Sequence, residues 1–206
     1  AHVGRFGSLE AIVETKGEIL DDLTASDTAV LNADQLHYSA WQLRAAPARI
    51  ISFGESCTAD VQLIDLIDHG FDGSDITVDA MGARMSLHLS IPGKGGVTNA
   101  LAAIAAAMAL DIDVSLIAQG IEALSPVEGR GNTLHLEKGI RLIDDSYNAS
   151  PASMTAAFDS MKATPPKIMI LSEMRELGKE TTPEHNALIP QINALSPRVV
   201  IAIGPA

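Results

Sequence analysis

The chain has 206 residues, 47% of them hydrophobic and 19% charged, which corresponds to one or two folded domains rather than a disordered protein. Its 26 acidic residues outnumber its 14 basic residues and give a net charge of −12, so general binding to nucleic acid or to an anionic membrane is disfavoured. Cys57 is the only cysteine, which excludes an intrachain disulfide and a thiolate metal cluster. With no apolar run long enough to span a bilayer, these features favour a cytoplasmic protein.

The N-terminal quarter predicts alternating helices and strands. A helix is expected over Gly7–Leu20, with Ser8 as its N-cap. Apolar runs predict strands at Thr28–Asn32 and Arg49–Gly54, and helical spacing predicts a helix between them at Asp34–Leu43. This order is typical of a parallel sheet with crossover helices.

The next segment predicts strands without helices between them. Three short β-prone runs occupy Val61–Ile67, Asp75–Asp79 and Met85–Ile91, separated by turn-like sequences. Links this short permit only antiparallel pairing, so we expect a small meander attached to the main sheet.

Two helices and a boundary follow. The sequence predicts helices over Val97–Leu110 and Val114–Leu124, and then a Pro/Gly-containing segment, Ser125–Gly131, that is typical of a domain boundary. We therefore expect one domain over residues 1–126 and a second over residues 127–206.

The second domain is predicted to alternate strand and helix as a doubly wound module. Ser150 and Pro151 have the residue types of a helix N-cap and first helical position. The expected elements are strands at Ile140–Asp145, Lys167–Leu171 and Val199–Ile203, and helices at Pro151–Met161 and Pro183–Leu195. Because the chain has no initiator Met and stops just after a strand-like run, we expect it to be part of a larger protein.

Standard catalytic motifs are absent from the sequence, but one polar cluster stands at the end of a predicted strand. There is no G-x-x-x-x-G-K-[ST] phosphate loop, and the six histidines lack metal-ligand spacing. The run Leu142–Pro151 leads from a strand through two carboxylates to a helix N-terminus, a place where nucleotides bind in α/β proteins. It fits equally well a simple turn closed by Asp145 and Ser146, with Ser150 capping the helix. Arg130, between two glycines, fits either an anion-binding residue or a solvated linker arginine.

Several segments together resemble one enzyme family. They are Ala1-His2, Thr15-Lys16-Gly17, Thr98-Asn99-Ala100, Glu128-Gly129-Arg130 and above all Asp144–Met154, which is similar to the signature D-D-S-Y-N-A-N-P-x-S-M. In order and spacing the chain resembles the Mur ligases of peptidoglycan synthesis.

The resemblance implies an α/β chain that holds the back half of a central ATPase domain and the first part of a Rossmann-like C-terminal domain. The implied activity is ATP- and Mg²⁺-dependent joining of D-Ala-D-Ala to UDP-N-acetylmuramoyl-tripeptide through an acyl phosphate. Neither nucleic-acid binding nor membrane insertion is expected.

The resemblance also implies roles for particular residues. His2 is similar to a magnesium ligand of the family, and Lys16 to a catalytic lysine that is carbamylated to support the metal. Arg130 is similar to a catalytic arginine that reaches the ATP phosphates. The residues that the resemblance places at the nucleotide are Asn99, Arg130, Asp145, Tyr147 and Asn148. Gly96 departs from the family, which usually has Asn there.

Other assignments stay open at the level of sequence. Another Mur ligase or a folylpolyglutamate synthase relative has the same overall plan, although the wording Asp145–Asn148 favours the D-Ala-D-Ala-adding type. Because the phosphate loop is missing from this chain, a non-catalytic nucleotide-binding module is a further alternative.

Overall fold

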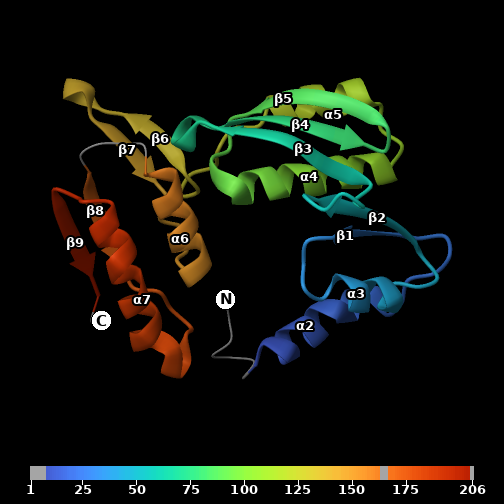
Figure 1. The fold of residues 1–206 in the computed structure, drawn as a ribbon, viewed down its shortest axis with the longest axis horizontal. Helices are drawn as coiled ribbons and strands as arrows, with labels where there is room; N and C mark the ends of the chain where they lie inside the picture. Colours follow the sequence, from blue (N-terminus) through green and yellow to red (C-terminus); the bar gives the residue numbers. More distant parts are fainter. Residues whose placement is uncertain (1–7, 163–166, 205–206) are drawn as a thin grey trace. The chain divides into compact units, whose positions relative to one another are not determined.

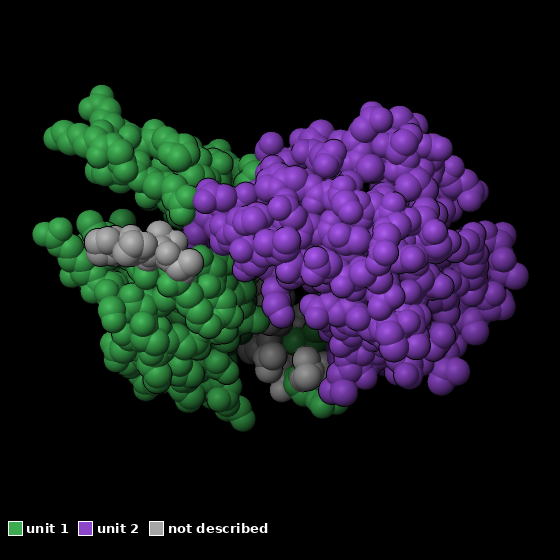
Figure 2. All heavy atoms as spheres, turned by 45° about the horizontal axis from the view of Figure 1, so that its top comes forward, with its two compact units in different colours: residues 1–12, 126–206 green, residues 13–125 purple. Residues whose placement is uncertain are grey.

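The computed structural model describes residues 8–162 and 167–204 and divides the chain into two compact units. One unit is formed by residues 13–125, and the other contains residues 126–206 with the first twelve residues (Figure 2). The expected domains, residues 1–126 and 127–206, stay a prediction; the two units differ from them in grouping the first twelve residues with residues 126–206. Each unit is described by itself.

The first strands of unit 13–125 form the parallel part of a five-stranded sheet. Strands β1 (Thr28–Asn32) and β2 (Arg49–Gly54) pair in parallel and have the predicted bounds. Helix α3 (Tyr38–Arg44) connects them but starts four residues later than predicted. The delay has a local cause, because the Asp34 N–H donates to Asn32 Oδ1 at 2.9 Å and holds this stretch in a turn.

Upstream of β1 lies helix α2 (Leu9–Gly17), followed by a short 3₁₀ turn, η1 (Glu18–Leu20). The predicted cap is confirmed, since the Ala11 N–H donates to Ser8 Oγ at 3.1 Å.

The predicted antiparallel meander is confirmed. Strand β3 (Val61–Asp68) pairs in parallel with β2 and antiparallel with β4 (Ser74–Ala80), which in turn pairs antiparallel with β5 (Ala83–Leu89). A 3₁₀ turn, η2 (Gly70–Asp72), joins β3 to β4. Between β4 and β5, Met81 and Gly82 both have positive φ, the geometry of a tight hairpin turn. The sheet order is β1-β2-β3-β4-β5.

Two helices, α4 (Gly93–Ala109) and α5 (Val114–Glu122), run along the strands of this sheet and cover one of its faces (Figure 1). Apolar side chains on alternate positions of the strands meet the helices there and form the core of the unit. Fully buried members are Ile51, Val61, Ile76, Val78, Leu89, Leu101 and Ile104.

Unit 126–206 contains two small sheets. Strand β7 (Arg141–Asp144) pairs antiparallel with β6 (Asn132–His135), a strand that the sequence did not predict, across the 3₁₀ turn η3 (Glu137–Gly139). Strands β8 (Ile168–Ser172) and β9 (Val199–Ile203) pair in parallel. The structure thus differs from the single sheet expected for the three predicted strands, because β7 takes β6 as its partner.

The helices of this unit are α6 (Pro151–Ser160) and α7 (Thr181–Ala194), the latter preceded by a 3₁₀ turn, η4 (Gly178–Glu180). They pack on each other around a second core, whose buried members are Phe158, Met169, Met174, Leu188 and Leu195. In the described part of the chain, none of the helices has the length and apolar character needed to cross a membrane.

Candidate functional site at the end of strand β7

Arg130 lies on a tight turn that needs glycine on both sides. Gly129 and Gly131 have φ of 76° and 73°, values that side-chain-bearing residues rarely adopt. The Arg130 N–H closes the turn by donating to the Val127 carbonyl at 3.0 Å. Both glycines are buried while Arg130 is exposed, so the turn presents the guanidinium to solvent. We call residues 127–131 the arginine turn.

The arginine turn is tied to the end of β7 by backbone groups. The Gly129 N–H donates to Asp144 Oδ2 at 3.2 Å, and the Tyr147 N–H donates to the Gly129 carbonyl at 3.0 Å. The Gly131 N–H donates to the Asp145 carboxylate. Asp144, Asp145 and Tyr147 therefore hold the arginine turn in place.

The two neighbouring carboxylates differ in acidity. Hydrogen bonds from the Ser146 hydroxyl and N–H, and from the Gly129 N–H, lower the pKa of Asp144. The pKa of Asp145 is raised, first by partial desolvation and then by the charge of Asp144, although the Gly131 N–H and the Arg130 charge act in the opposite direction. Asp144 is thus a structural anion, whereas Asp145 keeps an exposed carboxylate near a positive charge.

Tyr147 and Asn148 lie on the same loop as Asp145. The Arg130 Cζ lies 4.0 Å from the centroid of the Tyr147 ring, a cation–π contact. The Asn148 side-chain oxygen accepts the Ala149 N–H at 3.0 Å, and the side chain is exposed. The structure therefore gathers Arg130, Asp145, Tyr147 and Asn148 at one strand end.

The helix that follows this loop is capped as predicted. Ser150 Oγ accepts the Ser153 N–H at 3.2 Å, and Ser153 Oγ accepts the Ser150 N–H at 2.9 Å, a reciprocal capping box. The turn interpretation of this segment is also partly realised, but Asp144 rather than Asp145 accepts the Ser146 N–H.

Lys16 and Asn99 belong to the other unit and lie on different elements. Lys16 is exposed at the C-terminal end of α2 and lines an apolar cavity of about 300 Å³ with Leu20 and Trp41. Arg44 holds this region together, because it pairs with Asp21 and, at 2.9 Å, with Glu14. Asn99 is exposed in the second turn of α4 rather than the first, since the helix begins at Gly93.

Gly96, the departure from the family pattern, is a position of close backbone approach. A Cβ there would lie 2.7 Å from the Ile91 carbonyl oxygen. The first turn of α4 therefore packs against Ile91 in a way that leaves no room for a side chain at position 96.

His2, the other predicted metal residue, lies outside the described residues. Within the ranges 8–162 and 167–204, no group of three His, Cys, Asp or Glu side chains is arranged to hold a metal ion.

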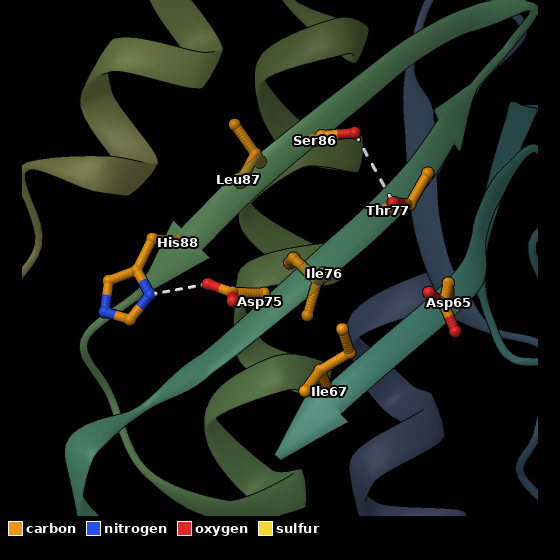
Figure 3. Close-up of a pocket in the computed structure, with 8 residues that line it drawn as sticks. All are labelled: Asp65, Ile67, Asp75, Ile76, Thr77, Ser86, Leu87 and His88. Carbon is orange, nitrogen blue, oxygen red and sulfur yellow. Dashed lines mark hydrogen bonds and ion pairs between the residues drawn. The ribbon is translucent and has the colours of Figure 1, made fainter. Parts of the chain in front are cut away.

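A second polar cluster lies on the solvent face of the meander. Asp75 accepts hydrogen bonds from His69 Nε2 at 2.9 Å and from His88 Nδ1 at 2.7 Å. Figure 3 shows Asp75 and His88 at one end of a shallow depression of about 280 Å³, with Thr77 and Ser86 further along it. Cross-strand pairing places Asp75 opposite His88 and Thr77 opposite Ser86, so no spacing along the sequence could have predicted this cluster.

Comparison with known proteins assigns the chain to a family. Residues 1–107 match the family described as Mur ligase middle domain, and residues 129–206 match the family described as Mur ligase, glutamate ligase domain. A UDP-N-acetylmuramoyl-tripeptide–D-alanyl-D-alanine ligase of Haemophilus influenzae is 32% identical over 206 residues, covering 99% of this chain and 44% of that protein.

Solved structures agree in fold. A crystal structure of MurF from Acinetobacter baumannii has a TM-score of 0.90 and 28% identity, covering 100% of this chain and 45% of that one. MurF of Thermotoga maritima, solved in complex with ADP, has a TM-score of 0.78 and 23% identity, covering 98% of this chain and 50% of that one.

The fold is that of a two-unit α/β protein in which Arg130, Asp145, Tyr147 and Asn148 are collected at the end of β7. The family matches make the assignment specific: the chain belongs to the Mur ligase family. It spans just under half the length of the relatives described above.

Proposed function

We propose that this chain is part of an ATP-dependent amide ligase that adds D-Ala-D-Ala to UDP-N-acetylmuramoyl-tripeptide. The observation that carries the proposal is the strand end of β7, where backbone hydrogen bonds hold Arg130 and Asp145 beside each other. The relative of H. influenzae, aligned over the whole chain, is described by this reaction. The proposal includes a cytoplasmic location, as the single cysteine favours.

In the proposed reaction, ATP supplies a phosphoryl group that converts the tripeptide carboxylate into a better acyl donor. The role of Asp145 is to accept a hydrogen bond from a ribose hydroxyl, which an exposed carboxylate does well. The role of Arg130 is to donate N–H groups to phosphate oxygens as their negative charge rises. The T. maritima protein of the same fold was solved with ADP, which agrees with a nucleotide at this family's site.

The remaining predicted residues belong to the other unit in this proposal. Asn99 contributes a contact to adenine, and a carbamylated Lys16 contributes an anionic oxygen of the kind that Mg²⁺ prefers. His2 is assigned to the same metal by resemblance only. Residues 1–126 are proposed as the back part of the central domain, and residues 127–206 as the first part of the C-terminal domain.

The test uses the complete ligase, by which we mean a protein of the relatives' full length that contains this chain. Phosphate release is measured with UDP-N-acetylmuramoyl-tripeptide and D-Ala-D-Ala, each omitted in turn. We expect release only when ATP and both substrates are present. Release with another amine donor in place of D-Ala-D-Ala, or with neither, would contradict the proposal.

A further inference from the structure

Arg130 and Tyr147 form a cation–π contact at the surface. Tyr147 is 68% exposed and Arg130 is also exposed, yet the guanidinium lies over the ring face with its Cζ 4.0 Å from the ring centroid. An arginine side chain at the surface ordinarily samples many rotamers, so fixing it in one of them costs conformational entropy.

The backbone beneath this pair is already fixed. The Tyr147 N–H donates to the Gly129 carbonyl, and a Cβ at Gly129 would lie 3.2 Å from the Tyr147 Cβ. The arginine turn and the loop that carries Tyr147 therefore approach as closely as a glycine allows. As a result, the origins of the two side chains are held at a constant separation.

A guanidinium carbon 4.0 Å from the ring centroid fits the stacked arrangement, in which the ring covers one face of the group and leaves its N–H edge uncovered. In a cation–π contact the flat face lies on the ring, whereas the N–H donors point outward in the plane of the group. The charge of the Asp145 carboxylate interacts with that of Arg130, and the cation–π contact itself takes up none of the guanidinium N–H donors. The contact thus orders the side chain without using its hydrogen-bonding capacity.

From this geometry we infer that Tyr147 is a positioning residue for Arg130, whose ring holds the guanidinium so that its N–H edge is ready for phosphate oxygens. This inference rests on the proposed function, and it gives Tyr147 a role distinct from direct contact with the nucleotide. In this role the aromatic ring of Tyr147 binds the planar cation of Arg130, and Arg130 in turn binds the phosphate.

The first experiment examines the contact alone, in the 206-residue chain. The Arg130 side-chain protons are followed by NMR in the wild type, Tyr147→Phe and Tyr147→Leu. We expect the ring to shift these protons upfield in the first two proteins and not in Tyr147→Leu. Identical Arg130 shifts in all three would overturn the inference, whatever the activity of the complete ligase.

The second experiment is a double-mutant cycle in the complete ligase with Tyr147→Leu and Arg130→Ala. A cation–π contact at an exposed site predicts that Tyr147→Leu lowers kcat about two- to fivefold, with KM for ATP nearly unchanged and with Tyr147→Phe active. In the Arg130→Ala background, Tyr147→Leu should have no further effect. Thermal melts of each variant control for folding.

The outcomes separate the two ideas. The positioning role is refuted if the effects of the two substitutions are additive, or if Tyr147→Leu raises the KM for ATP in the Arg130→Ala background. Either result would place Tyr147 at the nucleotide, and the ligase assignment would stand. An inactive wild type would refute the ligase assignment and, with it, the role of Tyr147, even if the NMR contact is present.

Discussion

Two adjacent glycines in α4 provide a sharp test of the close approach at the start of that helix. A Cβ at Gly96 would lie 2.7 Å from the Ile91 carbonyl oxygen, whereas a Cβ at Gly95 would meet no atom within 4 Å. Both residues are helical and share the same turn. Substituting each by alanine therefore changes the helix propensity equally and the packing differently.

The expected magnitudes follow from these two terms. Replacing glycine by alanine in a helix gains about 0.5–1 kcal/mol, so Gly95→Ala should stabilise the unit by up to that amount. Gly96→Ala gains the same but forces backbone atoms apart, at an overpacking cost of about 1–3 kcal/mol. The difference between the two variants therefore isolates the close approach, at about 1–3 kcal/mol.

Urea unfolding followed by the fluorescence of Trp41, the only tryptophan, measures both variants in the unit that contains α4. Gly95→Ala should shift the midpoint upward and Gly96→Ala downward. If both variants were stabilised equally, the first turn of α4 would not lie against Ile91 and the explanation of Gly96 would be wrong. Gly96→Asn, which restores the usual family residue, should be at least as destabilising as Gly96→Ala.

Three further predictions concern charge and activity. Asp145→Asn in the complete ligase should weaken ATP binding about tenfold or more, since a charge-assisted hydrogen bond is worth about 1.5–3 kcal/mol, and calorimetry would detect the loss. Because folding raises the pKa of Asp145, the contribution of this group to stability is favourable at acidic pH and is lost as the pH rises through that pKa. At neutral pH the melting temperature of Asp145→Asn should therefore equal or exceed that of the wild type, and a lower melting temperature would contradict this. Hydrogen bonds from His69 and, next in size, His88 lower the pKa of Asp75, so the stability that they provide should be lost as the pH falls through that pKa. Asp75→Asn should therefore reduce the fall of the melting temperature at acidic pH, and an unchanged dependence of the melting temperature on pH would refute this prediction. The 206-residue chain alone should release no phosphate with ATP and both substrates, because its sequence contains no phosphate loop, and substrate-dependent release would refute this.

Local sequence patterns were sufficient for most elements of the fold. The bounds of β1, β2 and β9 were predicted correctly because each is a short apolar run between polar or turn-forming residues. The strand β6 was missed because Asn132–His135 is short and mostly polar, and it exists through its pairing with β7. Helix α4 starts at Gly93, earlier than predicted, because its first turn contains glycines that disfavour helix by propensity; the close approach of Ile91 explains the glycine at position 96.

The candidate site was predictable only in part. The run from Leu142 to Pro151 was recognised from its order of strand, carboxylates and helix cap. No local pattern could show that Asp144 binds the Gly129 N–H or that Tyr147 stacks under Arg130, because these contacts join segments distant in sequence. Such contacts depend on the tertiary course of the chain around β7.

The hydrogen bonds between the arginine turn and the end of β7 also fix the backbone beneath two opposite charges. Since the Gly129 N–H binds Asp144 and the Gly131 N–H binds Asp145, the backbone positions that carry the Arg130 and Asp145 side chains keep a constant spacing. In the proposed function, a nucleotide at this surface meets a cation and a carboxylate whose backbones are already in place, and little entropy is lost in ordering them.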